Sequence, residues 1–565
     1  MPLNDNGVNN RNLIVVVMLF MAMMFCYSYF TGNNDPEPQK ADEVEHFSNS
    51  SNGTSPAKTR QPEISIEEAI TSRRRVMIEN ENIMGSIDPN GCILDIVTLK
   101  GYRQTTEKDS EYVRLLTPKG TRTEFYYGIT YNDKTNNERL DEDAVWIPDE
   151  QRKDTVVLNI QTKHGVTVKR TVAIDDKYLI NVTDEVTNAS DKAISISANA
   201  YMVRSNPTPS NYAVVHEGLI GNSSGKITEL KYGDVGGKTR LSESDWFGFT
   251  DIHWLCALIN KDPNFKISYL KTGDDSFKIS AASCNDIELQ PNTTTKICYS
   301  AFTGPKDIGI LSKYGKQLGL HKFDMAIDFG WFFIVTKPLI HIMDILAKVF
   351  SNMGLVILIL TLMFKILTYP LTRKSFTSMA KMKALQPRIA VLQKTYSNDK
   401  MRLNQELIAL YKKENVSPMS GCLPMLLQAP IFFCLYKVFF VSIQMRHAPL
   451  FLWISDLSVP DPLYVFNLFG LIDWTPPGFL CIGVWPIIMG LTMFLQQRLS
   501  SAKSASPAEK TNEQKMQENM MIVLPIMFTY ICSSFPVGVV IYWTISNIIS
   551  MVQQRYTMGR YATLS

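Results

Sequence analysis

Apolar and polar residues are distributed very unevenly along this chain of 565 residues. Long, nearly charge-free runs lie near the N-terminus and in the C-terminal part, whereas the stretch between them is rich in Asn, Thr, Asp and Lys. An apolar run of about 20 residues is long enough to cross a bilayer as a helix. The pattern therefore predicts a protein of more than one unit that lies partly in lipid and partly in water.

Six apolar runs are predicted to cross the membrane. The first, 13–30, lacks the small residues of a signal-peptidase site behind it, so we expect an uncleaved anchor rather than a removed signal. The other five are 350–372, 420–443, 479–499, 519–534 and 536–553. The last two are short for a standard bilayer, and we expect the membrane around them to be thin.

The long polar stretch alternates between apolar and polar residues, as strands do. After a polar linker at 31–62, residues 155–174 form a predicted hairpin with its turn at 163–165, and 178–187 continue the period of two. Dense Thr and Val with frequent turn residues favour an all-β sandwich of roughly 250 residues, which we place at 63–328. The run Arg73-Arg74-Arg75 is expected to be a solvated surface.

Two segments outside the spans are predicted to be helical. Residues 329–346 are apolar and aromatic but interrupted by Pro338, which favours a helix lying on the membrane surface. Residues 373–418 are charged and carry apolar residues near a helical period, so a helical hairpin is expected there, with Pro387 marking a kink or a helix start. Within the loop 444–478, residues 463–472 form a predicted interfacial segment.

Charge fixes the predicted orientation. The hairpin 373–418 carries ten basic and three acidic residues, whereas 444–478 has one basic residue against three aspartates. The positive-inside rule places the hairpin in the cytoplasm and 444–478 outside. Counting spans then puts the N-terminal residues 1–12, the loop 500–518 and the tail 554–565 in the cytoplasm, and the β unit outside.

Composition excludes several classes of site. The nine cysteines show no CxxC pair and no Cys/His ligand spacing, so no metal site is expected. No GxxxxGK[ST] loop occurs, so we expect neither nucleotide hydrolysis nor a cofactor. Disulfides are left open among four cysteines of the β unit: Cys92, Cys256, Cys284 and Cys298.

Lys365 is the residue that points to a function. It lies in the second span, eight residues or about 12 Å before Arg373. A central lysine costs on the order of 2.5–3.5 kcal/mol on insertion scales. Its side chain could snorkel to the headgroups. Alternatively it faces a water-filled cavity lined by polar residues of several spans: Thr361, Gln428, Asn519, Thr529, Ser546 and Asn547.

Several motifs, in order along almost the whole chain, resemble the YidC/Oxa/Alb family of membrane protein insertases, in its Gram-negative form with a large periplasmic domain. The C-terminal motifs are YPLT at 369–372, SMAKMKALQP at 378–387, GCLPMLLQAPIF at 421–432, FPVG at 535–538 and YWTISN at 542–547. The β unit contributes WFGFTD at 246–251 and FDMAIDFGW at 323–331.

The resemblance implies a bacterial inner-membrane protein with six transmembrane helices, five of them in an insertase bundle, and a galactose-mutarotase-like periplasmic β-supersandwich. It implies a hydrophilic groove open to the cytoplasm, in which Lys365 replaces the usual Arg and is accompanied by Thr361 and Gln428. Leu426 and Phe432 match residues of a hydrophobic slide, to which Tyr542 and Trp543 are assigned.

The implied activity is insertion, folding and assembly of nascent integral membrane proteins, without covalent chemistry and with or without the Sec translocon. The hairpin 373–418 would receive the ribosome or the targeting machinery. The tail, with only Arg560 beyond Arg555, predicts little ribosome binding. Membrane lipids are further expected partners, and direct reading of nucleic acid is not expected.

Two other functions are compatible with parts of the sequence. A secondary transporter would also have polar residues in its spans, but it predicts intramembrane acids and inverted repeats, which are not visible. A sugar-active enzyme could use His164, His216 and His253 of the β unit with nearby carboxylates. We expect His164 at a hairpin tip and His253 in a strand, where structural roles are more usual.

Overall fold

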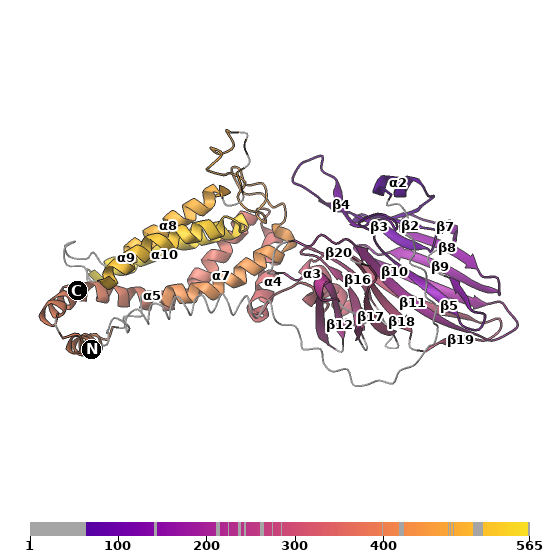
Figure 1. Ribbon diagram of the computed structural model, residues 1–565, viewed down its shortest axis with the longest axis horizontal. Coiled ribbons are helices and arrows are strands. Elements are labelled where there is room, and N and C mark those ends of the chain that lie inside the picture. The colour runs from indigo at the N-terminus through magenta and orange to yellow at the C-terminus, as the bar shows by residue number, and fades with distance from the viewer. Residues whose placement is uncertain are drawn as a thin grey trace, which may run out of the picture. The chain divides into compact units, whose positions relative to one another are not determined.

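A computed structural model describes residues 64–562 apart from 141–143, 211–214, 224, 236–238, 242–243, 260–264, 274, 284, 398, 417–422, 473, 475, 478–479 and 501–511. The predicted anchor 13–30 and linker 31–62 therefore lie outside the described residues. The chain divides into a β-rich unit that ends at Asp328 and a helical unit that begins at Phe329 (Figure 1).

The β unit contains two antiparallel sheets within the described residues. The first has 11 strands. Its main path runs β1 (Val76–Glu79), β2 (Ile83–Asp88), β3 (Ile93–Arg103), β5 (Phe125–Asp133), β11 (Ile194–Ser205), β18 (Ser276–Ser283), β17 (Phe265–Lys271) and β14 (Thr239–Leu241). Three strands pair beside this path, β4 (Tyr112–Leu116) with β3, β6 (Glu138–Leu140) with β5 and β19 (Ile287–Leu289) with β11.

The second sheet has nine strands. Its order is β13 (Lys226–Lys231), β12 (Gly218–Ser223), β15 (Ser244–Thr250), β16 (Trp254–Ile259), β20 (Thr294–Pro305), β10 (Leu179–Asn188), β9 (Val166–Ile174), β8 (Thr155–Gln161) and β7 (Ile147–Gln151). The predicted hairpin is confirmed by the pairing of β8 with β9, and Gly165 in its turn has a φ of 86°. Helices α2 (Ile66–Thr71) and α3 (Ile308–Leu318) accompany the sheets.

A buried ion pair within the second sheet makes contacts with the first. The Arg170 guanidinium on β9 donates to both carboxylate oxygens of Asp184 on β10, at 2.8 and 2.7 Å. It also reaches across to the carbonyl of Ile129 on β5, 3.3 Å away, and the Tyr131 hydroxyl on the same strand donates to Asp184. These contacts connect facing sheets, so the β unit is a sandwich with a polar link inside its core.

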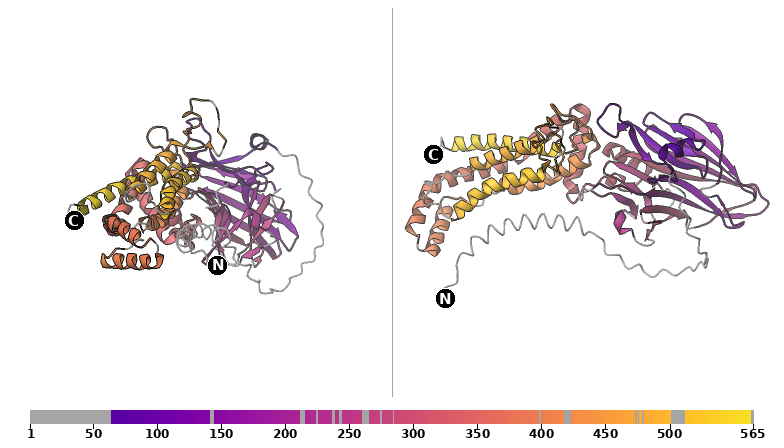
Figure 2. Two further views of the ribbon diagram at one scale, coloured as in Figure 1. Left: turned by 60° about the vertical axis from the view of Figure 1, so that its left-hand side comes forward. Right: turned by 45° about the horizontal axis from the view of Figure 1, so that its top comes forward.

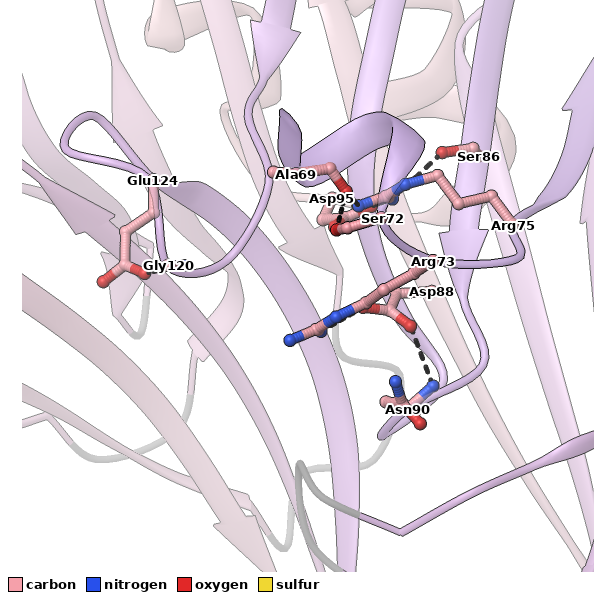
Figure 3. Close-up of polar contacts among 10 residues, drawn as sticks. All are labelled: Ala69, Ser72, Arg73, Arg75, Ser86, Asp88, Asn90, Asp95, Gly120 and Glu124. Carbon is pink, nitrogen blue, oxygen red and sulfur yellow. Dashed lines mark hydrogen bonds and ion pairs between the residues drawn. The ribbon is translucent and has the colours of Figure 1, made fainter. Parts of the chain in front are cut away.

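The basic run at its N-terminal edge is solvated only in part: Arg73 and Arg74 are exposed, as predicted, whereas Arg75 is not. Arg75 is 7% exposed in its side chain and pairs with the buried Asp95 at 2.6 Å (Figure 3). Arg73 is more exposed but also pairs with a buried carboxylate, Asp88, at 2.7 Å. Burial raises the pKa of Asp95 to about 6, although the hydrogen bond from Arg75 acts in the opposite direction.

The helical unit begins with α4 (Phe333–Val349), in which Pro338 does not break the helix. Next comes α5 (Met353–Thr395), 43 residues that run without interruption through Pro370 and Pro387. The predicted second span and the first arm of the predicted hairpin are thus one helix, and Pro387 is not a helix start. The second arm is α6 (Lys400–Lys413). Its Leu407, Leu410 and Tyr411, together with Val416 just beyond it, pack on Leu385 and Ile389 of α5.

Four further helices complete the described unit: α7 (Leu423–Val441), α8 (Val484–Ser500), α9 (Asn512–Cys532) and α10 (Val537–Ala562). Helices α9 and α10 are longer than the predicted apolar segments because polar residues extend them at one end. By contrast, α8 starts at Val484, later than the predicted start at 479. Helices α5, α8 and α10 run alongside one another (Figure 1 and Figure 2), and α8 meets α9 closely at Gly490, where a Cβ would lie 2.0 Å from the Thr529 hydroxyl.

Among the described helices, α5 alone is both long and apolar enough to cross a membrane. The apolar helical stretches Gln428–Val441 and Ile522–Cys532 are shorter. The predicted count of six spans is therefore not confirmed. Outward-facing apolar residues are nevertheless abundant on α8 and α9, with Leu491 at 56% and Ile526 at 64% exposure, and lipid is the solvent that such surfaces suit.

Candidate functional site

The candidate site is a row of polar contacts that α10 makes with α5 and α7. Tyr542, Ser546 and Ser550 recur every four residues on α10 and so share one face of that helix. We call the contacts of this face with Lys365 and Gln428 the polar seam. Buried polar residues also occur elsewhere in these helices, such as Thr544 and Gln554, but the seam includes a buried cation, Lys365.

Lys365 lies at one end of the polar seam. It is 8% exposed, and its ammonium donates a hydrogen bond of 2.7 Å to the Ser550 hydroxyl. Among the described residues it has no carboxylate partner. Since a buried cation costs free energy when it is not paired, the charge of Lys365 is held in place by a neutral oxygen alone.

Gln428 lies at the other end. Its side-chain amide donates to the Tyr542 hydroxyl at 2.8 Å, and the Ser546 hydroxyl donates to its carbonyl oxygen at 3.4 Å. Three of the predicted residues are thus brought together, with α7 contributing one and α10 two. Such contacts between helices also hold a bundle together, each contributing about 0.6 kcal/mol on average in a membrane protein.

The remaining predicted polar residues have other contacts. Thr361 is buried but donates to the carbonyl of Ile357 in its own helix at 2.7 Å. Asn547 lies on another face of α10 and donates to Thr492 of α8 at 3.2 Å. Asn519 is exposed and bonds to none of the described residues. The structure therefore does not join these three to the seam, although Thr361 lies one turn from Lys365.

The predicted slide residues form an aromatic cluster. The Phe432 ring is 4.6 Å from that of Trp543 and 6.2 Å from that of Phe535, and Trp543 also meets Phe528 at 5.1 Å. Tyr542 is turned to Gln428 instead and is fully buried. The side chain of Leu426 lies outside the described part of α7. The aromatic rings thus connect α7, α9 and α10 beside the polar seam.

Sequence reasoning missed two polar residues. Ser550 was detectable, because it lies four residues after Ser546 on α10. Lys437 was overlooked in an apolar run, yet it is only 5% exposed within α7. The aliphatic part of the Lys437 side chain packs close to Gly330. A Cβ added at Gly330 would lie 3.3 Å from Lys437 Cε, so the glycine leaves room for the lysine.

The candidate histidines of the β unit are not assembled into a site. His164 is in the turn of the β8–β9 hairpin, as predicted. His253 lies in the bend between β15 and β16, so its predicted strand position is wrong. His216 is buried, its Nε2 is 3.0 Å from the carbonyl of Leu219, and burial lowers its pKa to about 4. A neutral, buried ring suits a structural role.

The cysteines of the β unit are not paired where they are described. Cys92, Cys256 and Cys298 carry free thiols, whereas Cys284 lies outside the described residues. Burial raises the pKa of Cys92 to about 11, so its thiol is not reactive at neutral pH.

Comparisons with known proteins cover nearly all of the chain. The family described as "60Kd inner membrane protein" matches residues 345–563, and "YidC periplasmic domain" matches residues 75–342. The "Membrane protein insertase YidC" of Rickettsia rickettsii (strain Iowa) is 37% identical over 574 residues, which cover 98% of this chain and 99% of that protein. Its counterpart in Nitrobacter hamburgensis is 37% identical over 522 residues, with 87% and 84% covered.

Two solved structures are also similar. One is described as "Active YidC insertase crystal structure with the first transmembrane domain resolved", with 15% identity, a TM-score of 0.35, and coverage of 85% of this chain and 92% of that one. The other is a galactose mutarotase-like protein from Lactobacillus casei, with 10% identity, a TM-score of 0.31, and coverage of 41% and 100%. On its full-length similarity to the curated insertases, the chain belongs to the YidC family of membrane protein insertases.

Proposed function

We propose that this protein inserts integral proteins into the bacterial inner membrane and helps them fold, by drawing polar chain into a groove built around the polar seam. The observation that carries this proposal is the buried ammonium of Lys365, held by Ser550 without a carboxylate partner among the described residues. An unneutralised cation deep in a helical bundle attracts anions, and an acidic tail of a nascent membrane protein is an anion of this kind.

The first proposed step is electrostatic capture. A hydrophilic tail enters from the cytoplasm and its carboxylates approach Lys365, which can exchange the Ser550 hydroxyl for a charged acceptor. Hydrogen bonds to Gln428 and Tyr542 replace part of the water that the tail loses. The desolvation barrier falls because each polar group of the tail finds a partner before it leaves water.

The second proposed step is partition of the apolar segment into lipid. The proposed surface is the aromatic cluster next to the seam, in which Phe432 is buried against the partly exposed Trp543, and Leu426 belongs to the same helix as Phe432. An apolar segment can slide along this surface without meeting a polar side chain. Burial of its surface in hydrocarbon drives the release at roughly 25 cal/mol per Å², so neither nucleotide hydrolysis nor any covalent step is required.

The proposed topology has six spans, with both termini in the cytoplasm and the β unit in the periplasm. The charge asymmetry between 373–418 and 444–478 supports this orientation. In this arrangement the arm formed by α6 and the second half of α5 projects into the cytoplasm. Its basic surface is the proposed receiving site for the ribosome or targeting machinery, and cooperation with the Sec translocon is proposed from the family resemblance.

Reconstitution tests the proposal directly. Purified full-length protein is placed in liposomes with a single-span substrate, and protease protection of the translocated tail reports insertion. We expect insertion above that of empty liposomes in the absence of nucleotide. Equal protection in liposomes with and without the protein would contradict an insertase function, whereas transport of a small solute instead would favour the transporter alternative.

A further inference from the structure

A second polar site lies on the opposite face of α5 from Lys365, near the end of its apolar part. It is a hollow of about 450 Å³. We call it the basic hollow, and its lining residues are Pro370, Arg373, Lys374, Thr377, Ser378, Lys381 and Asn415. All but Asn415 lie on α5 at spacings of three or four, which is the spacing of one helix face. Asn415 follows α6, so the hollow is formed where the hairpin returns toward α5.

The charge of the basic hollow is not neutralised within the described residues. Arg373, Lys374 and Lys381 have no ion pair with any of them. The acid nearest in sequence to Asn415 is Glu414, and it pairs with Arg388 at 3.0 Å. Thr377 donates its hydroxyl to the carbonyl of Arg373, whereas the Ser378 hydroxyl has no partner among the described residues. Three cations and a hydroxyl donor around one hollow are suited to a phosphate group.

The same face of α5 is apolar and exposed on the membrane side of the hollow. Met363, Ile366 and Leu367 are 37%, 73% and 72% exposed. At 100° per residue, Met363 and Leu367 lie within about 60° of both Pro370 and Lys374 around the helix axis. An apolar strip that lies about level with Lys365 therefore leads toward the basic hollow, whose cations Arg373, Lys374 and Lys381 lie about 12–24 Å farther along the helix.

We propose that the basic hollow binds the headgroup of an anionic phospholipid of the cytoplasmic leaflet, with the acyl chains lying along the exposed apolar strip of α5. The phosphodiester is placed between Lys374 and Lys381, and Arg373 can hold it in a bidentate manner. A free phosphate would contact the cations of the basic hollow but not the apolar strip. A phospholipid can contact both, through its headgroup and its acyl chains. This site is independent of the polar seam and would remain if the insertion mechanism proposed above were wrong.

Native mass spectrometry of the detergent-purified full chain tests the proposal, with phosphatidylglycerol, phosphatidylcholine and inorganic phosphate as separate probes. The test variant is Lys374→Gln with Lys381→Gln. The matched control is Lys412→Gln with Lys413→Gln, which removes the same charge from exposed positions at the end of α6. A third variant, Lys374→Arg with Lys381→Arg, retains the charge and shows whether loss of binding comes from loss of folding.

The expected result is a clear preference for phosphatidylglycerol in the native protein, the control and the arginine variant. In the glutamine test variant that preference is expected to fall at least about fivefold, since each cation at a membrane surface contributes substantially to binding of anionic lipid. Equal binding of both lipids, or equal loss in test and control variants, would overturn the proposal. Binding of inorganic phosphate without preference for the lipid would assign the hollow to a free anion and would also overturn it.

Discussion

The ammonium of Lys365 and the hydroxyl of Ser550 are 2.7 Å apart and connect α5 with α10, although the two residues are 185 positions apart in sequence. Ser550 is 8% exposed, so both groups are withdrawn from bulk solvent. A hydroxyl is a weak substitute for a carboxylate as partner of a cation. The pair therefore keeps the lysine in position while leaving its charge available to a stronger acceptor.

Replacing Ser550 with Ala tests whether this pair positions the cation. We expect the bundle to lose about 1.5–3 kcal/mol of stability, because a buried charged donor loses its partner. Insertion of substrates with acidic tails should fall several-fold. In the double variant with Lys365→Ala, the Ser550 change should have little further effect. Independent, additive losses of insertion from the two changes would show that Ser550 acts elsewhere, and thermal unfolding measures the stability difference.

The contact of Gln428 with Tyr542 gives a second prediction. Gln428→Ala and Tyr542→Phe each break the 2.8 Å hydrogen bond between α7 and α10. We expect a coupling free energy of about 0.6 kcal/mol in a double-mutant cycle on thermal unfolding in detergent, typical of such bonds in membrane proteins. Asn519→Ala is the control, because this exposed residue bonds to none of the described residues. A coupling of zero would mean that the bond does not contribute to stability.

The buried Arg170–Asp184 pair gives a third prediction, for the β unit. Arg170→Ala leaves the Asp184 carboxylate uncompensated and should destabilise strands β9 and β10 by about 3–5 kcal/mol. Replacing the pair together, Arg170→Met with Asp184→Leu, should cost clearly less because no charge remains buried. Hydrogen exchange of the β9 amides in the full-length protein measures the loss of stability in the single variant and in the double variant. The expectation fails if the double variant is the less stable of the two.

His216 is expected to make the stability of the β unit depend on pH. Its pKa is lowered by burial to about 4 from an ordinary 6.5, so the unfolded chain binds a proton that the folded β unit rejects. The resulting contribution to stability is complete above pH 6.5 and is lost as pH falls toward 4, by about 2 kcal/mol between pH 7 and pH 5. His216→Gln should remove this dependence, while its amide still reaches Leu219. The measurement is the difference in unfolding midpoint between the two proteins at each pH.

Asp95 changes the stability of the β unit with pH in the opposite direction to His216, over much of the same pH range. Its pKa is raised to about 6, so the folded protein holds a proton that the unfolded chain releases, and stability falls as pH rises through that range. A comparison of wild type with His216→Gln cancels this contribution, because Asp95 is present in both proteins. An unchanged pH dependence after the His216 replacement would show that the ring titrates normally.

Several features were predictable because they depend on local pattern. The strict alternation at 166–174 and the turn at Gly165 define the β8–β9 hairpin, and a lysine inside an apolar run identifies Lys365. The same alternation also predicts the positions of two buried charges. Arg170 is two residues from Val168 and Val172, and Asp184 is two residues from Val182 and Val186, so each charge lies on the same face of its strand as buried valines. Both could therefore have been assigned to the core.

Other features depend on tertiary contacts that no local pattern determines. Arg75 looks like part of a solvated basic run, and only the register of β1 to β3 brings it to Asp95. The spacing of Ser550 from Ser546 places it on the same face of α10, but only the packing of α10 on α5 brings it to Lys365. The apolar segments predicted for α9 and α10 were too short because helices extend into polar sequence wherever packing and capping support them.

The measurement that tests the central claim most directly is insertion by Lys365 variants of substrates that differ only in tail charge. In proteoliposomes, Lys365→Arg should retain insertion of an acidic-tailed substrate, Lys365→Ala should reduce it roughly tenfold, and Lys365→Glu should favour a basic tail instead. A neutral-tailed substrate should be affected little by any of the three. Equal losses for acidic and neutral tails, or no loss for either, would contradict electrostatic capture by Lys365.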